Sequence, residues 1–111
     1  MAPSYPPDLL PGTLDLLVLR LLERGPLHGY GIAQRLKERS QEVLQVGESS
    51  LYPALQRLLL NGYVDAEWAP SENNRRARYY RITSAGRRAL GREVESWQRF
   101  TAGVEALLRT T

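Results

Sequence analysis

Cysteine is absent from this chain of 111 residues, and His28 is the only histidine. These two shortages exclude disulfide bonds, cysteine-ligated metal clusters and a Cys/His nucleophile pair, so we expect no enzyme, no bound metal and no cofactor. A long apolar run is missing as well. Residues 9–22 are apolar, but Pro11, Asp15 and Arg20 interrupt them and the stretch is too short to cross a bilayer. Because no signal-peptide pattern precedes it, we expect a cytoplasmic protein without a membrane partner.

Acidic side chains are missing from residues 75–92, although this stretch holds seven arginines. The whole chain has 15 lysines and arginines against 12 acidic residues, a formal net charge of +3, so the other residues hold eight basic and twelve acidic side chains. Such a local concentration predicts a positively charged face directed at a polyanion. Arginine is also favoured where phosphate must be bound by a planar fork of donors. A solvated surface patch is the alternative interpretation.

The N-terminal part of the chain predicts a short arm followed by one helix. Three prolines within residues 1–8 indicate a flexible arm. The helix is expected from residue 12 or 13 to about residue 24, with Thr13 as its N-cap and Gly25-Pro26 as its stop. Leu16 and Leu19 fall outside its main apolar stripe, which predicts that they contact a partner. The stripe consists of Leu14, Leu17, Val18, Leu21 and Leu22.

Two further helices are expected before the middle of the chain. The second covers residues 29–39, with Ile32 and Leu36 on its inner face, and residues 43–46 predict a short strand or extended loop. The third runs from about residue 49 to Asn61-Gly62, which tolerate the left-handed conformation that ends a helix. The helical spacing places Leu60 on the outer face of this helix, and we expect it to pack beneath the hairpin that follows. The inner face of the third helix consists of Leu51, Leu55, Leu58 and Leu59.

The C-terminal half predicts a β-hairpin and one long helix. The hairpin has a polar tip at residues 70–74, and Thr83 is expected to cap a helix that reaches about residue 108. The alternating strand positions are Val64, Ala66 and Trp68, then Arg78, Tyr80 and Ile82. Apolar positions of the long helix step by four and three residues, which is typical of a coiled-coil seam and predicts a homodimer. The seam consists of Leu90, Val94, Trp97, Thr101, Val104 and Leu108.

The order of these elements predicts a winged helix-turn-helix, an α+β fold that is mainly α. Residues 9–83 would form the DNA-binding domain, and residues 84–111 a dimerisation helix. The third helix fits a major groove, and the amide of Gln56 suits a bidentate contact to adenine. The arginines of the wing (the hairpin) would follow the phosphate backbone or enter a minor groove, so they supply affinity while the third helix supplies specificity. For any single polar residue of that helix, an ordinary solvent-exposed surface is an equal alternative.

Several motifs together resemble the PadR family of transcriptional regulators, in the short form with a single C-terminal dimerisation helix. The resemblance extends over roughly residues 9–97. The motifs are Leu27-His28-Gly29-Tyr30-Gly31-Ile32, Ser50-Leu51-Tyr52-Pro53-Ala54-Leu55, Arg57-Leu58, Gly62-Tyr63-Val64, Glu67-Trp68, residues 71–78, Tyr79-Tyr80-Arg81-Ile82-Thr83 and Ala85-Gly86. The resemblance implies a homodimer on a palindromic operator of double-stranded DNA, usually acting as a repressor. A winged helix that binds another protein without reading DNA is the alternative.

The resemblance also implies which helices meet which partner. In similar proteins the first and last helices form the dimer, whereas the second helix, the third helix and the wing meet DNA. The DNA-contact candidates are Tyr30, Gln34, Arg35, Ser49, Ser50, Tyr52, Gln56, Asn73, Asn74, Arg75, Arg76 and Arg78. The dimer candidates are Leu16, Leu19, Leu90, Val94, Trp97, Val104 and Leu108.

Trp97 is a candidate for ligand binding as well as for packing. Glu95-Ser96-Trp97 is similar to a motif of multidrug-sensing relatives, in which the tryptophan stacks planar aromatic ligands in a pore between the two protomers. The remainder of the long helix departs from those relatives. A large aromatic residue at a seam position is also suited to simple packing, so a small aromatic effector and a purely structural role both stay open.

Overall fold

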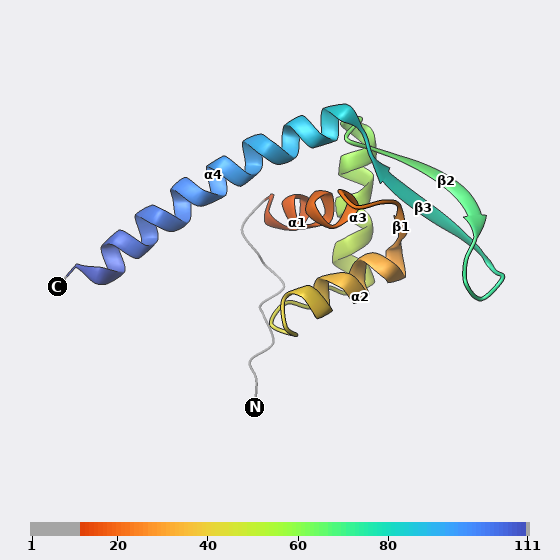
Figure 1. Ribbon diagram of the computed structural model, residues 1–111, viewed down its shortest axis with the longest axis horizontal. Coiled ribbons are helices and arrows are strands. Elements are labelled where there is room, and N and C mark those ends of the chain that lie inside the picture. Colours follow the sequence, from red (N-terminus) through yellow and green to blue (C-terminus); the bar gives the residue numbers. More distant parts are fainter. Residues whose placement is uncertain (1–11, 111) are drawn as a thin grey trace.

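The computed structural model describes residues 12–110, which form four helices and a three-stranded antiparallel sheet (Figure 1). This confirms the mainly α, winged-helix fold. The arm predicted for residues 1–8 lies outside the described residues. The elements are α1 (Thr13–Leu22), β1 (Leu27–His28), α2 (Gly29–Arg39), α3 (Glu48–Leu60), β2 (Val64–Pro70), β3 (Arg76–Ile82) and α4 (Ser84–Arg109).

Helix α1 lies at the centre of the fold and contacts α2, α3, α4 and β3. Its N-cap is Gly12, with a left-handed φ of 87° and no side-chain cap, so the expectation of Thr13 as the cap was wrong. The inner face also differs from the predicted stripe, because a helix covered from several directions can bury apolar residues on several sides. Its buried residues are Leu16, Val18, Leu19 and Leu22.

The burial of α1 overturns one expectation about the partner surface. Leu16 and Leu19 retain only 8% and 1% of their exposed surface, and both belong to the core of the single chain. Elements of the same protomer therefore cover the side of α1 that was assigned to a partner. The two leucines are core residues.

Helix α2 has the predicted bounds, and Ile32 and Leu36 are buried as expected. His28 caps it, since its Nδ1 accepts a hydrogen bond from the backbone N–H of Gly31 at 3.0 Å. A two-residue strand, β1, precedes α2, and residues 43–46 form a loop, which was one of the two alternatives expected there. A two-residue strand has too little length for a periodic signal, and only its pairing with β3 defines it.

Helix α3 buries Leu51, Leu55 and Leu58 and leaves its opposite face exposed, as predicted. It ends at Leu60, and Gly62, which follows the C-cap Asn61, has a left-handed φ of 73°. Leu60 is 85% exposed and does not pack beneath the wing, so that expectation was wrong. It is the last residue of α3, and its side chain lies in solvent.

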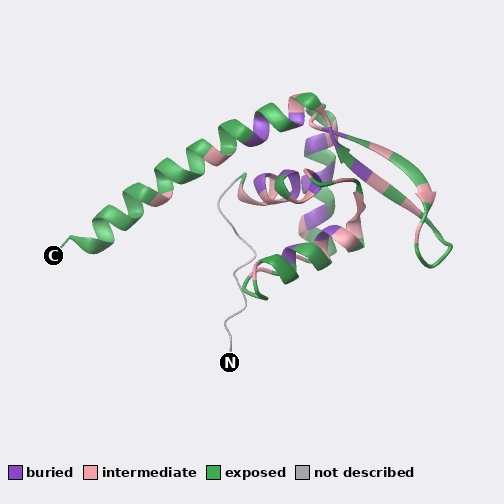
Figure 2. Ribbon diagram, viewed as in Figure 1, coloured by how far each residue is buried: buried purple, intermediate pink, exposed green. Residues whose placement is uncertain are grey.

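The sheet has the order β1-β3-β2, and the hairpin of β2 and β3 forms the wing. Directly opposed residues of an antiparallel pair share one face. Val64 and Ile82 are such a pair, as are Ala66 and Tyr80, and this face covers the core at the base of the wing. The outer half of the hairpin extends beyond the core and is mostly exposed (Figure 2). At its tip Asn74 adopts a left-handed φ of 63°.

Helix α4 begins at the predicted cap, because Thr83 Oγ1 accepts a hydrogen bond from Gly86 N–H at 3.0 Å. Ala89 and Leu90 are buried in the core, and beyond them α4 leaves the body in the direction opposite to the wing (Figure 1). Leu90 is only 3% exposed, so it too is a core residue and not a partner contact. The distal part of α4 has no cover within residues 12–110 (Figure 2).

The start of α4 depends on the absence of a side chain at Gly86. A Cβ atom there would overlap the carbonyl oxygen of Tyr63 and lie 2.8 Å from Ile82 Cγ1. We expect Gly86→Ala to lower the free energy of unfolding by about 2–3 kcal/mol, since overpacking forces the backbone apart. Gly91→Ala is the matched control, because a Cβ at Gly91 meets nothing within 4 Å and should stabilise the helix by about 0.8 kcal/mol. Urea denaturation followed by circular dichroism checks both, and equal midpoints for the two variants would contradict the close packing.

Candidate nucleic-acid interface

The start of α2, the outer face of α3 and the inner face of the wing line one open groove. Each element contributes residues from a different part of the chain. Those from the helices are His28, Gly29, Tyr30, Tyr52 and Gln56. Those from the wing are Trp68, Ser71, Glu72, Asn73, Arg75, Arg76, Ala77, Arg78 and Tyr80.

The strand register explains why two wing arginines face this groove. Arg78 is paired with Trp68, and Arg76 with Pro70, so both lie on the same face as the core pair Ala66 and Tyr80. The Cζ atom of Arg78 lies 5.7 Å from the centre of the Tyr80 ring, and that of Arg76 lies 5.9 Å from the Trp68 ring. The guanidinium groups are therefore held at aromatic faces that belong to the groove.

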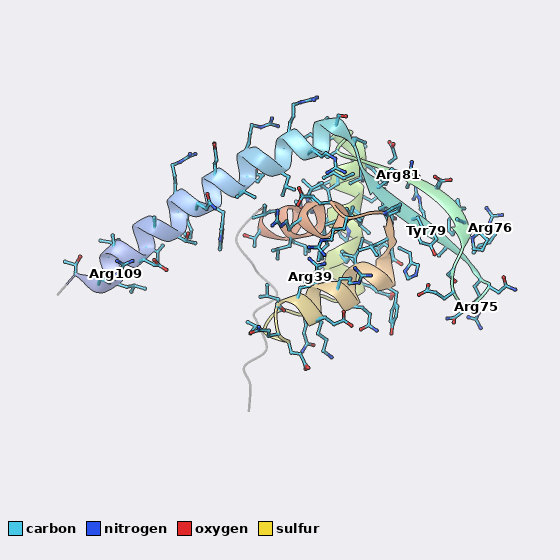
Figure 3. The ribbon with its side chains drawn as sticks, viewed as in Figure 1. Arg39, Arg75, Arg76, Tyr79, Arg81 and Arg109 are labelled. Atoms are coloured by element: carbon cyan, nitrogen blue, oxygen red, sulfur yellow. The ribbon has the colours of Figure 1, made fainter. Side chains whose placement is uncertain are left out.

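The arginine-rich stretch does not form a single face. Arg75 and Arg76 lie at the outer end of the wing, whereas Arg81 lies nearer its base (Figure 3). Arg81 Nη2 pairs with Glu67 Oε1 at 2.7 Å, and the register places both on the face away from the groove. Beyond Thr83 the chain turns into α4, which carries the other three arginines of the stretch away from the wing. The expectation of one basic face was wrong, since the strand-to-helix turn divides it.

Only part of the α2 candidate set reaches the groove. Tyr30 is 73% exposed and lines it, and its hydroxyl accepts a hydrogen bond from Gln34 Nε2 at 2.9 Å. Gln34 and Arg35 are exposed but line a second hollow, between α2 and the opposite side of the wing. The groove thus includes Tyr30 and excludes Gln34 and Arg35.

On α3, Tyr52 and Gln56 line the groove one turn apart. Tyr52 is 52% exposed, and Gln56 is exposed as well. Ser49 is exposed and Ser50 half-buried, and neither lines the groove. Of the four α3 candidates, the tyrosine and the glutamine at its centre thus line this groove.

Arg57 lies beside these residues on α3, but its guanidinium group pairs with a carboxylate of α1. Its Nη2 and Nε donate to the two carboxylate oxygens of Asp15 on α1, at 2.7 and 3.2 Å. The hydrogen bond to Asp15 raises the pKa of Arg57 above its ordinary value. This bidentate pair fixes α3 against α1 and was not evident from the sequence.

Glu72 and Trp68 are among the groove residues that were not identified as site residues from the sequence. Nδ1 of His28 accepts a hydrogen bond from Gly31, and Nε2 of the same ring faces Glu72 Oε1 at 3.4 Å. The pKa of the Glu72 carboxyl group is lowered mainly by a backbone hydrogen bond at Glu72. The contact with His28 lowers it further. Trp68 is 58% exposed on the inner face of the wing. Trp68 lies on the same strand face as the last core pair, one alternating position further out. This alternation could have identified it from the sequence.

The sequence matches the model of the transcriptional regulator PadR-like family over residues 18–92. The chain belongs to this family. A solved transcriptional regulator from Clostridium thermocellum is 30% identical, with a TM-score of 0.81 over 88% of this chain and 95% of that one. A PadR-family regulator from Eggerthella lenta is 33% identical, with a TM-score of 0.76 over 90% and 85% of the two chains. The uncharacterized protein X of Lysinibacillus sphaericus is 33% identical over 90 residues, which are 81% of this chain and 83% of that protein.

Membership of the PadR-like family confirms that the chain is a DNA-binding transcriptional regulator and not an enzyme. It also confirms the resemblance drawn from the motifs. None of the helices within residues 12–110 combines the length and the apolar character needed to span a bilayer. In the same part of the chain no three His, Asp or Glu side chains gather into a metal site.

The distal part of α4 in this PadR-family regulator has an apolar surface. Trp97 and Val104 are each 39% exposed and Leu108 is 79% exposed, while Val94 packs partly against the core. Phe100 lies beside Trp97, with ring centres 5.9 Å apart. An open hollow separates these two rings from the start of α1. It is lined by Gly12, Thr13, Leu16, Glu93, Ser96, Trp97 and Phe100.

Proposed function

We propose that this PadR-family regulator binds a palindromic operator as a homodimer and represses transcription there. The groove carries the proposal, because it gathers the central residues of α3 and the arginines of the wing on one side of the protomer. Two protomers related by a twofold axis would present two such grooves, and a twofold-symmetric operator matches them. Bound at an operator that overlaps a promoter, the dimer would exclude RNA polymerase.

Within each groove, the residues have different roles in this proposal. Tyr52 and Gln56 enter the major groove on α3, where the Gln56 amide selects a base by its donor and acceptor pattern.

The wing has a different role. Its arginines Arg75, Arg76 and Arg78 contact phosphates or an adjacent minor groove, so they contribute affinity for any sequence. Asn73 and Tyr30 line the same groove and supply further hydrogen bonds to the backbone, whereas the candidate Asn74, at the tip of the wing, does not line it. The other candidates, Gln34, Arg35, Ser49 and Ser50, lie outside the groove and make at most peripheral contacts.

Dimerisation through α4 is supported by apolar positions that residues 12–110 leave partly or largely exposed. Val94, Trp97, Val104 and Leu108 continue the spacing of four and three residues beyond the core residue Leu90. Side chains at these positions would interdigitate with the same residues of a second α4. Thr101 fits this seam, because its hydroxyl donates to the carbonyl of Trp97 at 3.0 Å and so needs no partner.

Selection of preferred duplexes from a random pool tests operator recognition and symmetry together. We expect a twofold-symmetric consensus from the wild type. Gln56→Ala should change the preferred base at one position of each half-site, whereas Arg76→Ala should weaken all sequences alike. A pool that yields no consensus, or a Gln56→Ala variant that selects the wild-type sequence, would contradict base recognition by α3. Binding that does not weaken with salt would instead favour the protein-binding alternative.

We further propose that a small planar aromatic molecule regulates DNA binding through the hollow beside Trp97. The support is local: two neighbouring aromatic rings, one of them Trp97, line a hollow next to the proposed dimer seam. In a Trp68→Phe background, Trp97 is the only tryptophan, so its emission reports on this hollow. We expect planar aromatic cations to quench that emission saturably and to weaken duplex binding by linkage. Linear, unsaturable quenching by a panel of such cations would leave Trp97 as a packing residue only.

A further inference from the structure

Trp68 is a large aromatic residue placed where the fold gives it little to pack against. The pairs Val64–Ile82 and Ala66–Tyr80 cover the core, and Trp68 belongs to the next pair outward, opposite Arg78. Its side chain is 58% exposed and lines the groove. Burial in the core of the protomer therefore does not account for a tryptophan at this position.

The surroundings of Trp68 are cationic on the groove side. Arg78 is its direct cross-strand partner, and the Arg76 guanidinium lies 5.9 Å from its ring centre. An arginine side chain loses rotamer freedom when it is fixed on a phosphate. A ring that already holds the guanidinium at the groove reduces that loss, and preorganisation of this kind increases affinity.

We propose that Trp68 positions Arg76 for the nucleic acid and that its exposed ring packs against the sugar-phosphate backbone in the complex. This inference rests on the proposed DNA-binding groove and assigns a second kind of contact to the wing. The ring covers deoxyribose, while the arginine beside it neutralises the adjoining phosphate. Arg75 provides an internal comparison, because it lies at the tip and no ring within residues 12–110 stacks with its guanidinium.

The first part of the test needs no DNA. In a Trp97→Phe parent, Trp68 is the only tryptophan, and its emission can be quenched by iodide or by caesium. Neighbouring guanidinium groups concentrate iodide at the ring, so we expect iodide to quench about twofold better than caesium. Arg76→Gln should remove most of this preference and Arg75→Gln much less, although both remove one positive charge. Equal effects of the two variants would overturn the juxtaposition of Arg76 and Trp68.

The second part measures binding to a duplex in the same Trp97→Phe parent. We expect Trp68→Leu to weaken binding about tenfold without changing the salt dependence, because no charge is lost. The effects of Trp68→Leu and Arg76→Ala should be less than multiplicative, whereas those of Trp68→Leu and Arg75→Ala should multiply. Trp68→Phe should restore part of the affinity, and the duplex should shield Trp68 from iodide.

The outcomes separate this inference from the function on which it rests. If the wild type binds no duplex, the proposed function fails, while the iodide result still decides the contact with Arg76. If the parent binds a duplex but Trp68 stays equally open to iodide and Trp68→Leu binds as well as the parent, the role of Trp68 is refuted. An affinity loss that appears only together with a lower melting temperature would make Trp68 a structural residue and would also refute it.

Discussion

Replacing Arg75 and Arg76 by alanine is expected to weaken binding to every duplex by about a thousandfold near physiological salt. Both side chains are exposed at the outer end of the wing, on the groove side of the hairpin (Figure 3). A dimer would lose four cations at once. At about 1 kcal/mol for each charge-assisted contact, the loss amounts to about 4 kcal/mol. Fluorescence anisotropy with a labelled operator and with an unrelated duplex measures it.

The salt dependence distinguishes this loss from a damaged fold. Each phosphate neutralised by the protein contributes about 0.9 to the slope of log affinity against log salt, so the slope should decrease by about three to four. The matched control is Arg81→Ala with Arg109→Ala, which removes the same charge from sites outside the groove. Arg81 pairs with Glu67, and Arg109 pairs with Glu105 near the end of α4. Equal losses in the two double variants would show that net charge, and not the wing, determines affinity.

Glutamate at Val104 and Leu108 is expected to dissociate the dimer. In the proposed seam these positions are one helical turn apart and would be buried against the partner's α4. Unpaired charges buried in an interface cost several kcal/mol, so the dimer dissociation constant should rise by a factor on the order of a thousand or more. Sedimentation equilibrium over a range of concentrations measures the change directly. Operator affinity should fall with it, because a monomer holds one half-site.

The chain offers a closely matched control for this variant. Ala102 and Ala106 have the same four-residue spacing on α4, but they lie on the face away from the seam and are exposed. Glutamate at both positions adds the same charge to the same stretch of helix, and it should leave the dimer intact. If the two double variants have the same mass in solution, the dimer does not form along the Val104 and Leu108 face.

Local patterns in the sequence determined most of the secondary structure of this PadR-family regulator. Helix α2 has the predicted bounds, and the cap of α4 is formed by the side chain of Thr83, as the sequence indicated. These features depend on contacts between residues at most four apart, which periodicity and capping rules describe well. Alternation and a polar tip also predicted the hairpin, with both strands and the turn between them.

Features that depend on distant residues could not be predicted in this way. The apolar pattern of α1 allowed a partner contact at Leu16 and Leu19, and only the packing of α2, α3, α4 and β3 around α1 shows that both are core residues. Strand β1 exists because it pairs with β3, more than fifty residues away in the chain. The bidentate contact of Arg57 with Asp15 joins residues 42 positions apart, and no local rule pairs them.

The candidate interface shows the same division. Residue types and spacing identified Tyr52, Gln56 and the wing arginines as candidates, and the structure gathers them in one groove. The arginine-rich stretch, continuous in sequence, is divided because the chain turns from β3 into α4, so position along the chain could not predict which cations share a face. Only the strand register shows that Trp68 belongs to the site, and only the contact with His28 shows it for Glu72. The sequence by itself thus determined the four helices, the hairpin and the family, whereas tertiary packing decided which of their residues meet, because those contacts join segments far apart in the chain.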